Sequence, residues 1–319
     1  MTRRAVVVGG GPAADAVATA LCGGLEPFEV VRVAGPGPQD PRPGAPDLVV
    51  EAAPDGPLPA KAAALAALLG WLPATVPIAV VTRHHTLAAL LPSLRHGSRV
   101  VGLRLLPGTP VVEVAMPAAF DDGVVDAVLD LLEGAGLVPL SCADVPGRIV
   151  DRLVASAALA SDALIQQGRA TPTEMAAAAA RAGLSLAAIE PHELAAVACA
   201  LHAGLGDAAR FAPPAPDPGT AVAAGPLALD VDTLAGRLEL VVIAEAYRLV
   251  GEAVAGADEI ERAMTQGAGW AAGPFTMAGR RGLRDVVTGL AVLSRAAGVD
   301  PITADRFAMP PLLWQMATV

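Results

Sequence analysis

The sequence has few aromatic residues, one lysine and three cysteines among its 319 residues. Aromatic side chains make up 3% of a chain that is 54% hydrophobic, so the core must be built mainly from Ala, Val and Leu. Few rings remain to stack on nucleobases, and Lys61 is the only lysine in a chain of net charge −10, which argues against binding along a phosphate backbone. The odd cysteine count, without metal-ligand spacing, argues against a disulfide framework and a metal site.

Long apolar runs are also missing. No run approaches the roughly 20 residues that span a bilayer, and the apolar stretch after the two N-terminal arginines is too short for a signal peptide. We therefore expect a soluble cytoplasmic protein that binds a small molecule rather than membranes or nucleic acids. A chain of this length can form two or three domains with a sizeable core.

The N-terminus combines a strand pattern with a glycine turn. Residues 5–11, AVVVGGG, predict a buried strand and turn, and 12–21 predict a helix. In the resulting G-x-G-x-x-A pattern, Gly9 permits the tight turn, Gly11 lets a pyrophosphate approach the backbone, and Ala14 allows close contact between helix and strand. The pattern predicts a Rossmann-type fold with NAD or NADP as cofactor.

The second predicted strand, 28–33, should end in an acidic residue that bonds the adenosine ribose, but Ala34 stands there. Arg32 or Arg42 could instead meet a 2′-phosphate; the alternative is that both are solvated surface residues. The following interval, 35–45, is rich in Pro and Gly and predicts a loop.

A second group of candidate residues follows the later strands. Strand 78–82 leads into His84 and His85, at the strand end where ligands bind in open α/β sheets, although a surface His pair can also be incidental. Pro146 and Gly147 form a turn that leads into a long apolar helix. Asp151 lies near the N-terminal end of this helix, where the helix dipole favours a carboxylate.

From Ile149 onward the chain is predicted to be mostly helical and to contain an internal repeat, with a linker at 212–226. The repeated segments are 168–183 with 253–269, 190–195 with 273–278, and 210–214 with 306–311.

Several of these segments resemble one known family. Residues 144–153, DVPGRIVDRL, match DxPGFxxNRL, the domain junction of the 3-hydroxyacyl-CoA dehydrogenase family, and 47–52, DLVVEA, match one of its strands. Residues 100–106, VVGLRLL, lie where the family has FxGxHFF, and 273–275, GPF, begin a match to its C-terminal signature.

The resemblance implies an α/β Rossmann-type N-terminal domain followed by two tandem all-α 3-hydroxyacyl-CoA dehydrogenase C-terminal-type domains. The implied boundaries are 1–143, 144–223 and 224–319. The two helical domains should pack against each other within one chain, as single-copy relatives do between chains. The protein is then either a monomer with an internal pseudo-dimer or a homodimer.

The resemblance also assigns functional positions. His85 falls on a substrate-contacting Ser of the family, Arg104 on the catalytic His, and Asp151 on a substrate-contacting Asn. Glu113 matches the Glu that orients the catalytic His. The implied cofactor-binding residues are Gly9, Gly11, Ala14, Asp55 and Lys61. The helical hairpin that helps the family hold coenzyme A is missing from this chain.

Arg104 changes the expected chemistry, because hydride transfer at a 3-hydroxyacyl group needs a residue that exchanges the hydroxyl proton. His suits this task near neutral pH, whereas arginine stays protonated. The first hypothesis is a divergent NAD(P)-dependent oxidoreductase of a 3-hydroxyacyl thioester or related hydroxy acid, with His85 as acid–base. The second is a non-redox thioester enzyme in which Arg104 stabilises an enolate. The third is a catalytically silent binding or scaffold protein.

Overall fold

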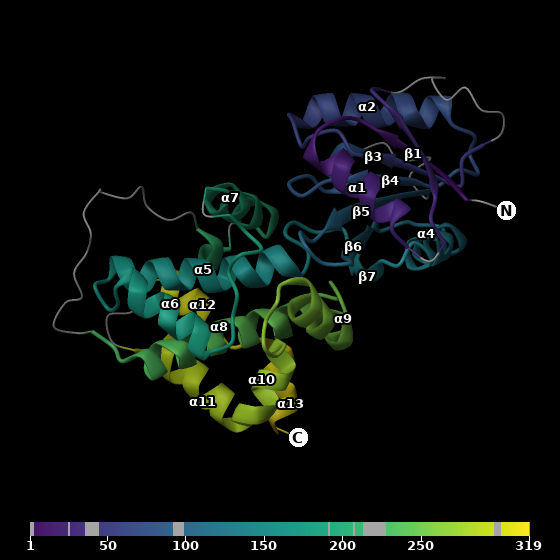
Figure 1. The fold of residues 1–319 in the computed structure, drawn as a ribbon. Coiled ribbons are helices and arrows are strands. Elements are labelled where there is room, and N and C mark those ends of the chain that lie inside the picture. Colours follow the sequence, from purple (N-terminus) through teal and green to yellow (C-terminus); the bar gives the residue numbers. More distant parts are fainter. Residues whose placement is uncertain are drawn as a thin grey trace. The chain divides into compact units, whose positions relative to one another are not determined.

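The computed structural model describes residues 3–24, 26–35, 45–91, 99–190, 192–206, 208–212, 228–296 and 301–318. The chain divides into two compact units, Met1–Arg148 and Ile149–Val319 (Figure 1). In the described part of the chain, no helix is long and apolar enough to cross a membrane.

The first unit contains a seven-stranded sheet in the order β2-β1-β3-β4-β5-β6-β7. All neighbouring strands are parallel except β5 and β6, which are antiparallel. The strands are β1 (Arg4–Val8), β2 (Glu29–Val33), β3 (Leu48–Glu51), β4 (Ile78–Val81), β5 (Val100–Leu105), β6 (Val111–Met116) and β7 (Val138–Ala143). Central strands such as β1 and β3 are mostly apolar because helices cover both of their faces; Arg4 and Glu51 stand at strand ends.

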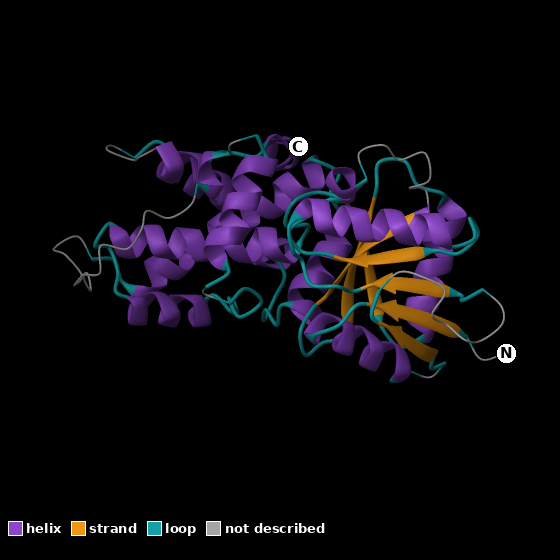
Figure 2. Ribbon diagram, turned by 90° about the horizontal axis from the view of Figure 1, so that it is seen from above, coloured by secondary structure: helices purple, strands orange, loops and turns teal. Residues whose placement is uncertain are grey.

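Helices lie on both faces of this sheet (Figure 2). They are α1 (Pro12–Cys22), α2 (Leu58–Trp71), α3 (Leu87–Leu90) and α4 (Asp122–Gly134). Because side chains alternate along a strand, Val7 of β1 packs with α1 and α4 on one face, while Val6 and Val8 pack with α2 and α3 on the other. The predicted strand–glycine turn–helix start is confirmed, and the sheet has the doubly covered arrangement of a Rossmann-type fold.

The second unit is all helical among its described residues. Its helices are α5 (Val150–Gln166), α6 (Pro172–Arg181), α7 (Leu194–Gly204), the 3-10 helix η2 (Ala209–Phe211), α8 (Val231–Gly251), α9 (Ala257–Arg262), the π-helix η3 (Ala263–Gly267), α10 (Pro274–Arg281), α11 (Leu283–Ser294), α12 (Pro301–Arg306) and α13 (Pro311–Thr318). Helix α8 is central: it contacts α5, α6, α10 and α13. Its sequence is apolar on most sides, as expected of a helix that neighbours surround.

The predicted repeat has a matching backbone feature in its two copies. Gly168 and Ala253, which begin the two repeated segments, both have left-handed backbones, with φ of 64° and 55°. Gly183 and Gly269, which end them, both have φ of 71° and both follow the helical segment of their copy. The predicted boundary between the copies at 223/224 lies outside the described residues, so a division into two tandem domains stays a prediction.

The first unit extends five residues past the predicted boundary at 143 (148 − 143 = 5) and ends at Arg148. The junction turn packs on the sheet: the Arg148 N–H donates to the Val145 carbonyl at 3.2 Å, and the Arg148 side chain lies beside Gly102 of β5. Sequence pattern could not show this, because the contact joins residues 46 positions apart (148 − 102 = 46).

Candidate functional site

The glycine turn after β1 leaves space over its backbone. Gly9 has φ of 120°, and a Cβ atom there would lie 2.5 Å from the Ala53 nitrogen, so no larger residue fits. Its N–H donates to the Val33 carbonyl at 2.9 Å. At Gly10 and Gly11, by contrast, a Cβ atom would meet nothing within 4 Å, and Gly11 precedes the first residue of α1. An anion can therefore approach this backbone and the N-terminal end of α1.

Ala14 and Arg32 complete this part of the site. Ala14 is fully buried and lets α1 lie close to the sheet, as predicted for the third motif position. Arg32, near the end of β2, forms an exposed 2.5 Å ion pair with Asp15 in the first turn of α1. Ala34 offers no carboxylate to a ribose, whereas Arg32 brings a cation to the same strand end. Arg42, the other predicted cation, lies outside the described residues.

Lys61, a predicted cofactor-binding residue, is buried at the ends of β3 and β4. It is 3% exposed, and its Nζ donates to the carbonyls of Ala53 at 2.6 Å and Val81 at 2.8 Å. The same atom lies 2.8 Å from the Glu51 carboxylate, and burial raises the pKa of Glu51 although Lys61 opposes the rise. An ammonium has three N–H bonds, so these contacts use all of them. Lys61 therefore ties the ends of β3 and β4 together.

Asp55 orders the loop that carries the predicted His pair. Its Oδ2 accepts from the backbone N–H groups of Arg83 at 2.6 Å and His84 at 3.0 Å. Burial alone would raise the pKa of Asp55, but these N–H donors outweigh it and hold the pKa below its ordinary value. Asp55, a predicted cofactor-binding residue, is thus a carboxylate that positions the loop leading to His85.

His85 presents one ring nitrogen with an available lone pair. Its Nε2 lies 2.9 Å from the Gly56 carbonyl, and a carbonyl oxygen only accepts hydrogen bonds. Nε2 therefore carries the proton of the neutral ring, which leaves Nδ1 able to accept one. The backbone N–H of His85 donates to Thr82 Oγ1 at 3.2 Å. This bond helps to fix the His85 backbone just after the end of β4.

Arg104 and Glu113 form a buried ion pair across β5 and β6. They are directly opposite in the antiparallel register, and Arg104 Nη1 lies 3.3 Å from Glu113 Oε2. Arg104 is 7% exposed and Glu113 fully buried. Of the four predicted catalytic residues, the structure brings these two into contact. His85 follows β4, the parallel neighbour of β5, so it lies at the adjacent strand end.

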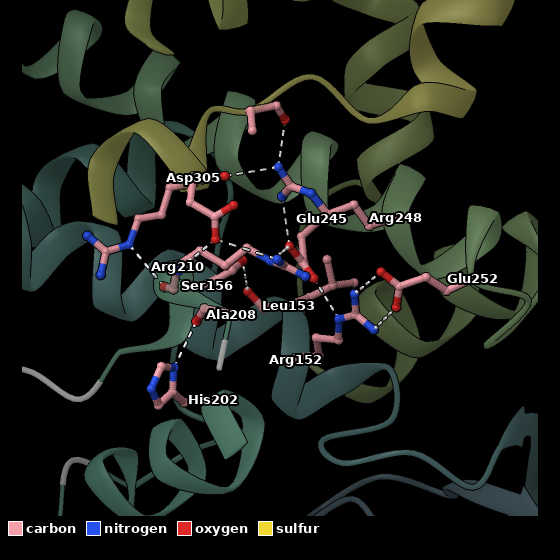
Figure 3. Close-up of polar contacts among 12 residues, drawn as sticks. Arg152, Leu153, Ser156, His202, Ala208, Arg210, Glu245, Arg248, Glu252 and Asp305 are labelled. Carbon is pink, nitrogen blue, oxygen red and sulfur yellow. Dashed lines mark hydrogen bonds and ion pairs between the residues drawn. The ribbon is translucent and has the colours of Figure 1, made fainter. Parts of the chain in front are cut away.

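Asp151, the fourth predicted residue, belongs to the second unit and is 2% exposed in the first turn of α5. Its neighbour Arg152 is fully buried: Nε lies 2.5 Å from Glu245, and Nη1 and Nη2 lie 2.6 and 2.9 Å from the two carboxylate oxygens of Glu252 (Figure 3). These contacts fix the turn of α5 that carries Asp151.

Two features were not predicted from the sequence. One is the cluster of Arg152, Arg210 and Arg248, which all donate to the Glu245 carboxylate. Its only signal in the sequence was the recurrence of Arg210 in the repeat. The other is Arg148, which is 4% exposed and stands where the family junction DxPGFxxNRL has Phe. A charged residue at an apolar motif position was the signal that could have identified it.

The sheet, the glycine turn and the helical unit define the class of this protein: a Rossmann-type domain followed by an all-α domain. Residues 234–318 match the model of the 3-hydroxyacyl-CoA dehydrogenase C-terminal domain. For residues 234–318, this match confirms the predicted resemblance to the 3-hydroxyacyl-CoA dehydrogenase family.

Solved structures agree at the level of fold. A 3-hydroxybutyryl-CoA dehydrogenase from Escherichia coli is 18% identical, with a TM-score of 0.79, covering 100% of this chain and 98% of that one. The dehydrogenase part of multifunctional enzyme 1 from C. elegans is 15% identical, with a TM-score of 0.60, covering 98% and 89% of the two chains. None of the curated proteins compared with the chain matches it in sequence.

Proposed function

We propose that this protein is a divergent NAD(P)-dependent oxidoreductase that acts on a 3-hydroxyacyl thioester or a related hydroxy acid. The observation that carries the proposal is the glycine turn, where Gly9 is closed against Ala53 and Gly10 and Gly11 leave room over the backbone. The 3-hydroxybutyryl-CoA dehydrogenase fold supports a hydroxyacyl compound as substrate, and the mostly parallel sheet supports a dinucleotide.

The chain's own residues can carry out the proton transfer that accompanies hydride transfer. The bound nicotinamide supplies or accepts the hydride. His85 Nδ1 takes the hydroxyl proton as the alcohol is oxidised and returns it in the reverse reaction. Arg104 stays protonated, and its role is electrostatic, next to a carbonyl or carboxylate oxygen.

The test is binding and turnover with the full-length chain. Addition of NADH or NADPH should raise the melting temperature, and turnover of acetoacetate or acetoacetyl-CoA should lower the absorbance at 340 nm. If NADH, NADPH and acyl-CoA all leave the melting temperature unchanged, the third hypothesis, a catalytically silent protein, replaces this proposal.

Substitution Gly11→Val should weaken nucleotide binding by about tenfold or more, because the new side chain enters the space over the turn. Its φ of 88° also costs roughly 1 kcal/mol of stability for a non-glycine residue. Gly108→Val is the matched control: Gly108 also has positive φ and open space around its missing Cβ, but lies in the β5–β6 turn. Equal NADH affinity in the two variants would refute the glycine-turn site.

Arg32→Ala should change the affinities for NADPH and NADH by different amounts. We expect NADPH affinity to fall by about tenfold while NADH affinity changes little, because Arg32 can pair with a 2′-phosphate at the end of β2. Isothermal titration with each nucleotide measures both affinities on one variant. If the affinities for NADPH and NADH fall equally or both remain unchanged, Arg32 does not recognise the 2′-phosphate.

The buried pair of Arg104 and Glu113 favours a second candidate, a non-redox thioester enzyme that uses the same strand ends. There Arg104 would stabilise an enolate oxygen, with no nicotinamide consumed. Product formation from an acyl thioester without a change at 340 nm would identify this activity. The tandem repeat, and either a monomer with an internal pseudo-dimer or a homodimer, are proposed with either function, and sedimentation would distinguish the two oligomeric states.

A further inference from the structure

Arg148 is a buried cation that sits on the sheet. Its guanidinium fills the space left by Gly102 of β5: a Cβ atom on Gly102 would lie 2.7 Å from Nη2 of Arg148 and 3.2 Å from the Ala115 side chain. Arg148 also has a left-handed backbone, with φ of 45°, which is uncommon for a non-glycine residue. The local backbone and the glycine opposite thus both accommodate this side chain.

One nitrogen of the Arg148 guanidinium is buried without a hydrogen-bond partner in the described part of the chain. Arg148 is 4% exposed, and its Nη1 is buried with no hydrogen-bond partner among the described residues. Asp144 does not supply one: its Oδ2 accepts from the Ala88 N–H at 3.0 Å, and its Oδ1 is itself buried without a partner in the described part of the chain. A buried charged donor without an acceptor is costly, so the site favours an incoming anion.

Glu113, Asp144 and Arg104 are the charged groups that, with Arg148, act on Cys142. Glu113 forms an ion pair with Arg104. Arg104 lies two residues after Gly102 on β5, and therefore on the same face of the sheet, about 7 Å from Gly102. Cys142 lies in register with Ala115, and burial, with Glu113 next in effect, raises the pKa of its thiol. At neutral pH the thiol is uncharged and cannot act as the counter-ion.

We infer that Arg148 binds the free carboxylate of the substrate, which is therefore a hydroxy acid or oxo acid rather than a coenzyme A thioester. A guanidinium pairs with a carboxylate through two parallel N–H···O bonds, whereas a thioester carries no charge to match it. This inference rests on the proposed oxidoreductase function and selects between its two substrate classes.

The experiment titrates the full-length chain with acetoacetate, acetoacetyl-CoA, NADH and NADPH, each alone. Wild type should bind acetoacetate, and Arg148→Met should weaken this binding by about 10- to 100-fold while leaving nucleotide affinity unchanged. Arg148→Lys should retain part of the affinity, since it keeps the charge but not the paired geometry. Arg148→Met should also melt at a higher temperature than wild type without ligand, because it removes a buried unpaired charge.

A second variant tests the same site without a substitution at Arg148. Gly102→Ala places a methyl group where the guanidinium lies and should also weaken acetoacetate binding. Wild type that binds acetoacetyl-CoA but not acetoacetate, or Arg148→Met that binds acetoacetate like wild type, would overturn the inference. If NADH or NADPH binds and acetoacetate does not, the inference fails while the oxidoreductase proposal stands. If acetoacetate binds through Arg148 and neither nucleotide binds, the oxidoreductase proposal fails while the carboxylate site stands.

Discussion

Glu245→Gln should destabilise the helical unit by about 3 to 5 kcal/mol, a large part of the stability of a typical domain. Glu245 is 1% exposed and receives Nε of Arg152 at 2.5 Å, Nε of Arg210 at 2.9 Å and Nη1 of Arg248 at 2.8 Å (Figure 3). Removing its charge leaves three largely buried guanidinium groups around a neutral amide. Chemical denaturation followed by circular dichroism measures the loss.

The matched control is Glu239→Gln on the same helix. Glu239 pairs with Arg281 at 3.0 Å, but its side chain is 30% exposed, so the substitution should cost about 1 kcal/mol or less. If the two variants lose similar free energies of unfolding, burial adds nothing to the stabilisation that the ion pairs of Glu245 provide.

The same cluster predicts how stability depends on pH. Burial alone would raise the pKa of Glu245, but Arg152, Arg248 and Arg210 outweigh it and lower the pKa to about 2. The folded pKa lies below the unfolded one, so the contribution is fully present above about pH 4.5 and disappears as the pH falls through 2. Wild type should lose about 3 kcal/mol over this range from this residue alone, and Glu245→Gln should lose that much less. Equal acid sensitivity in the two proteins would contradict the assignment.

The parts of this fold that could be predicted from sequence are those with local causes. The strand–glycine–helix pattern depends on neighbours only: an apolar run, Gly9 at a positive φ and a helix that begins at Pro12. The helical second unit was also predictable, because the spacing of its apolar residues and the junction turn at Gly147 each depend on a few neighbouring residues.

The parts that escaped prediction depend on residues far apart in the chain. Arg152 meets Glu245 across 93 positions, and in sequence both resemble solvated charges on helix surfaces. Lys61 matched a family position, but its bond to the Val81 carbonyl across 20 positions gives it a structural task. Arg148 stands where the family motif has Phe, but only the structure shows that its charge lies in the space beside Gly102.

His85→Ala should lower the rate of oxidation of NADH or NADPH by about 100- to 10,000-fold, the usual contribution of a general acid–base. The reason is that Arg104 cannot release a proton, while His85 Nδ1 retains a lone pair when Nε2 donates to Gly56. The measurement is the absorbance at 340 nm with acetoacetate and with acetoacetyl-CoA as separate substrates. Nucleotide affinity should stay unchanged, since the ring is assigned to proton transfer.

His84→Ala is the matched control for this experiment. His84 is the exposed neighbour, and its interaction with Asp55 uses the backbone N–H, which alanine keeps. It should therefore turn over like wild type, and added imidazole should restore part of the activity of His85→Ala but not change His84→Ala. Full activity in His85→Ala would remove His85 from the mechanism. Because Arg104 cannot serve as the base, the proton acceptor would then have to be another residue or the substrate itself.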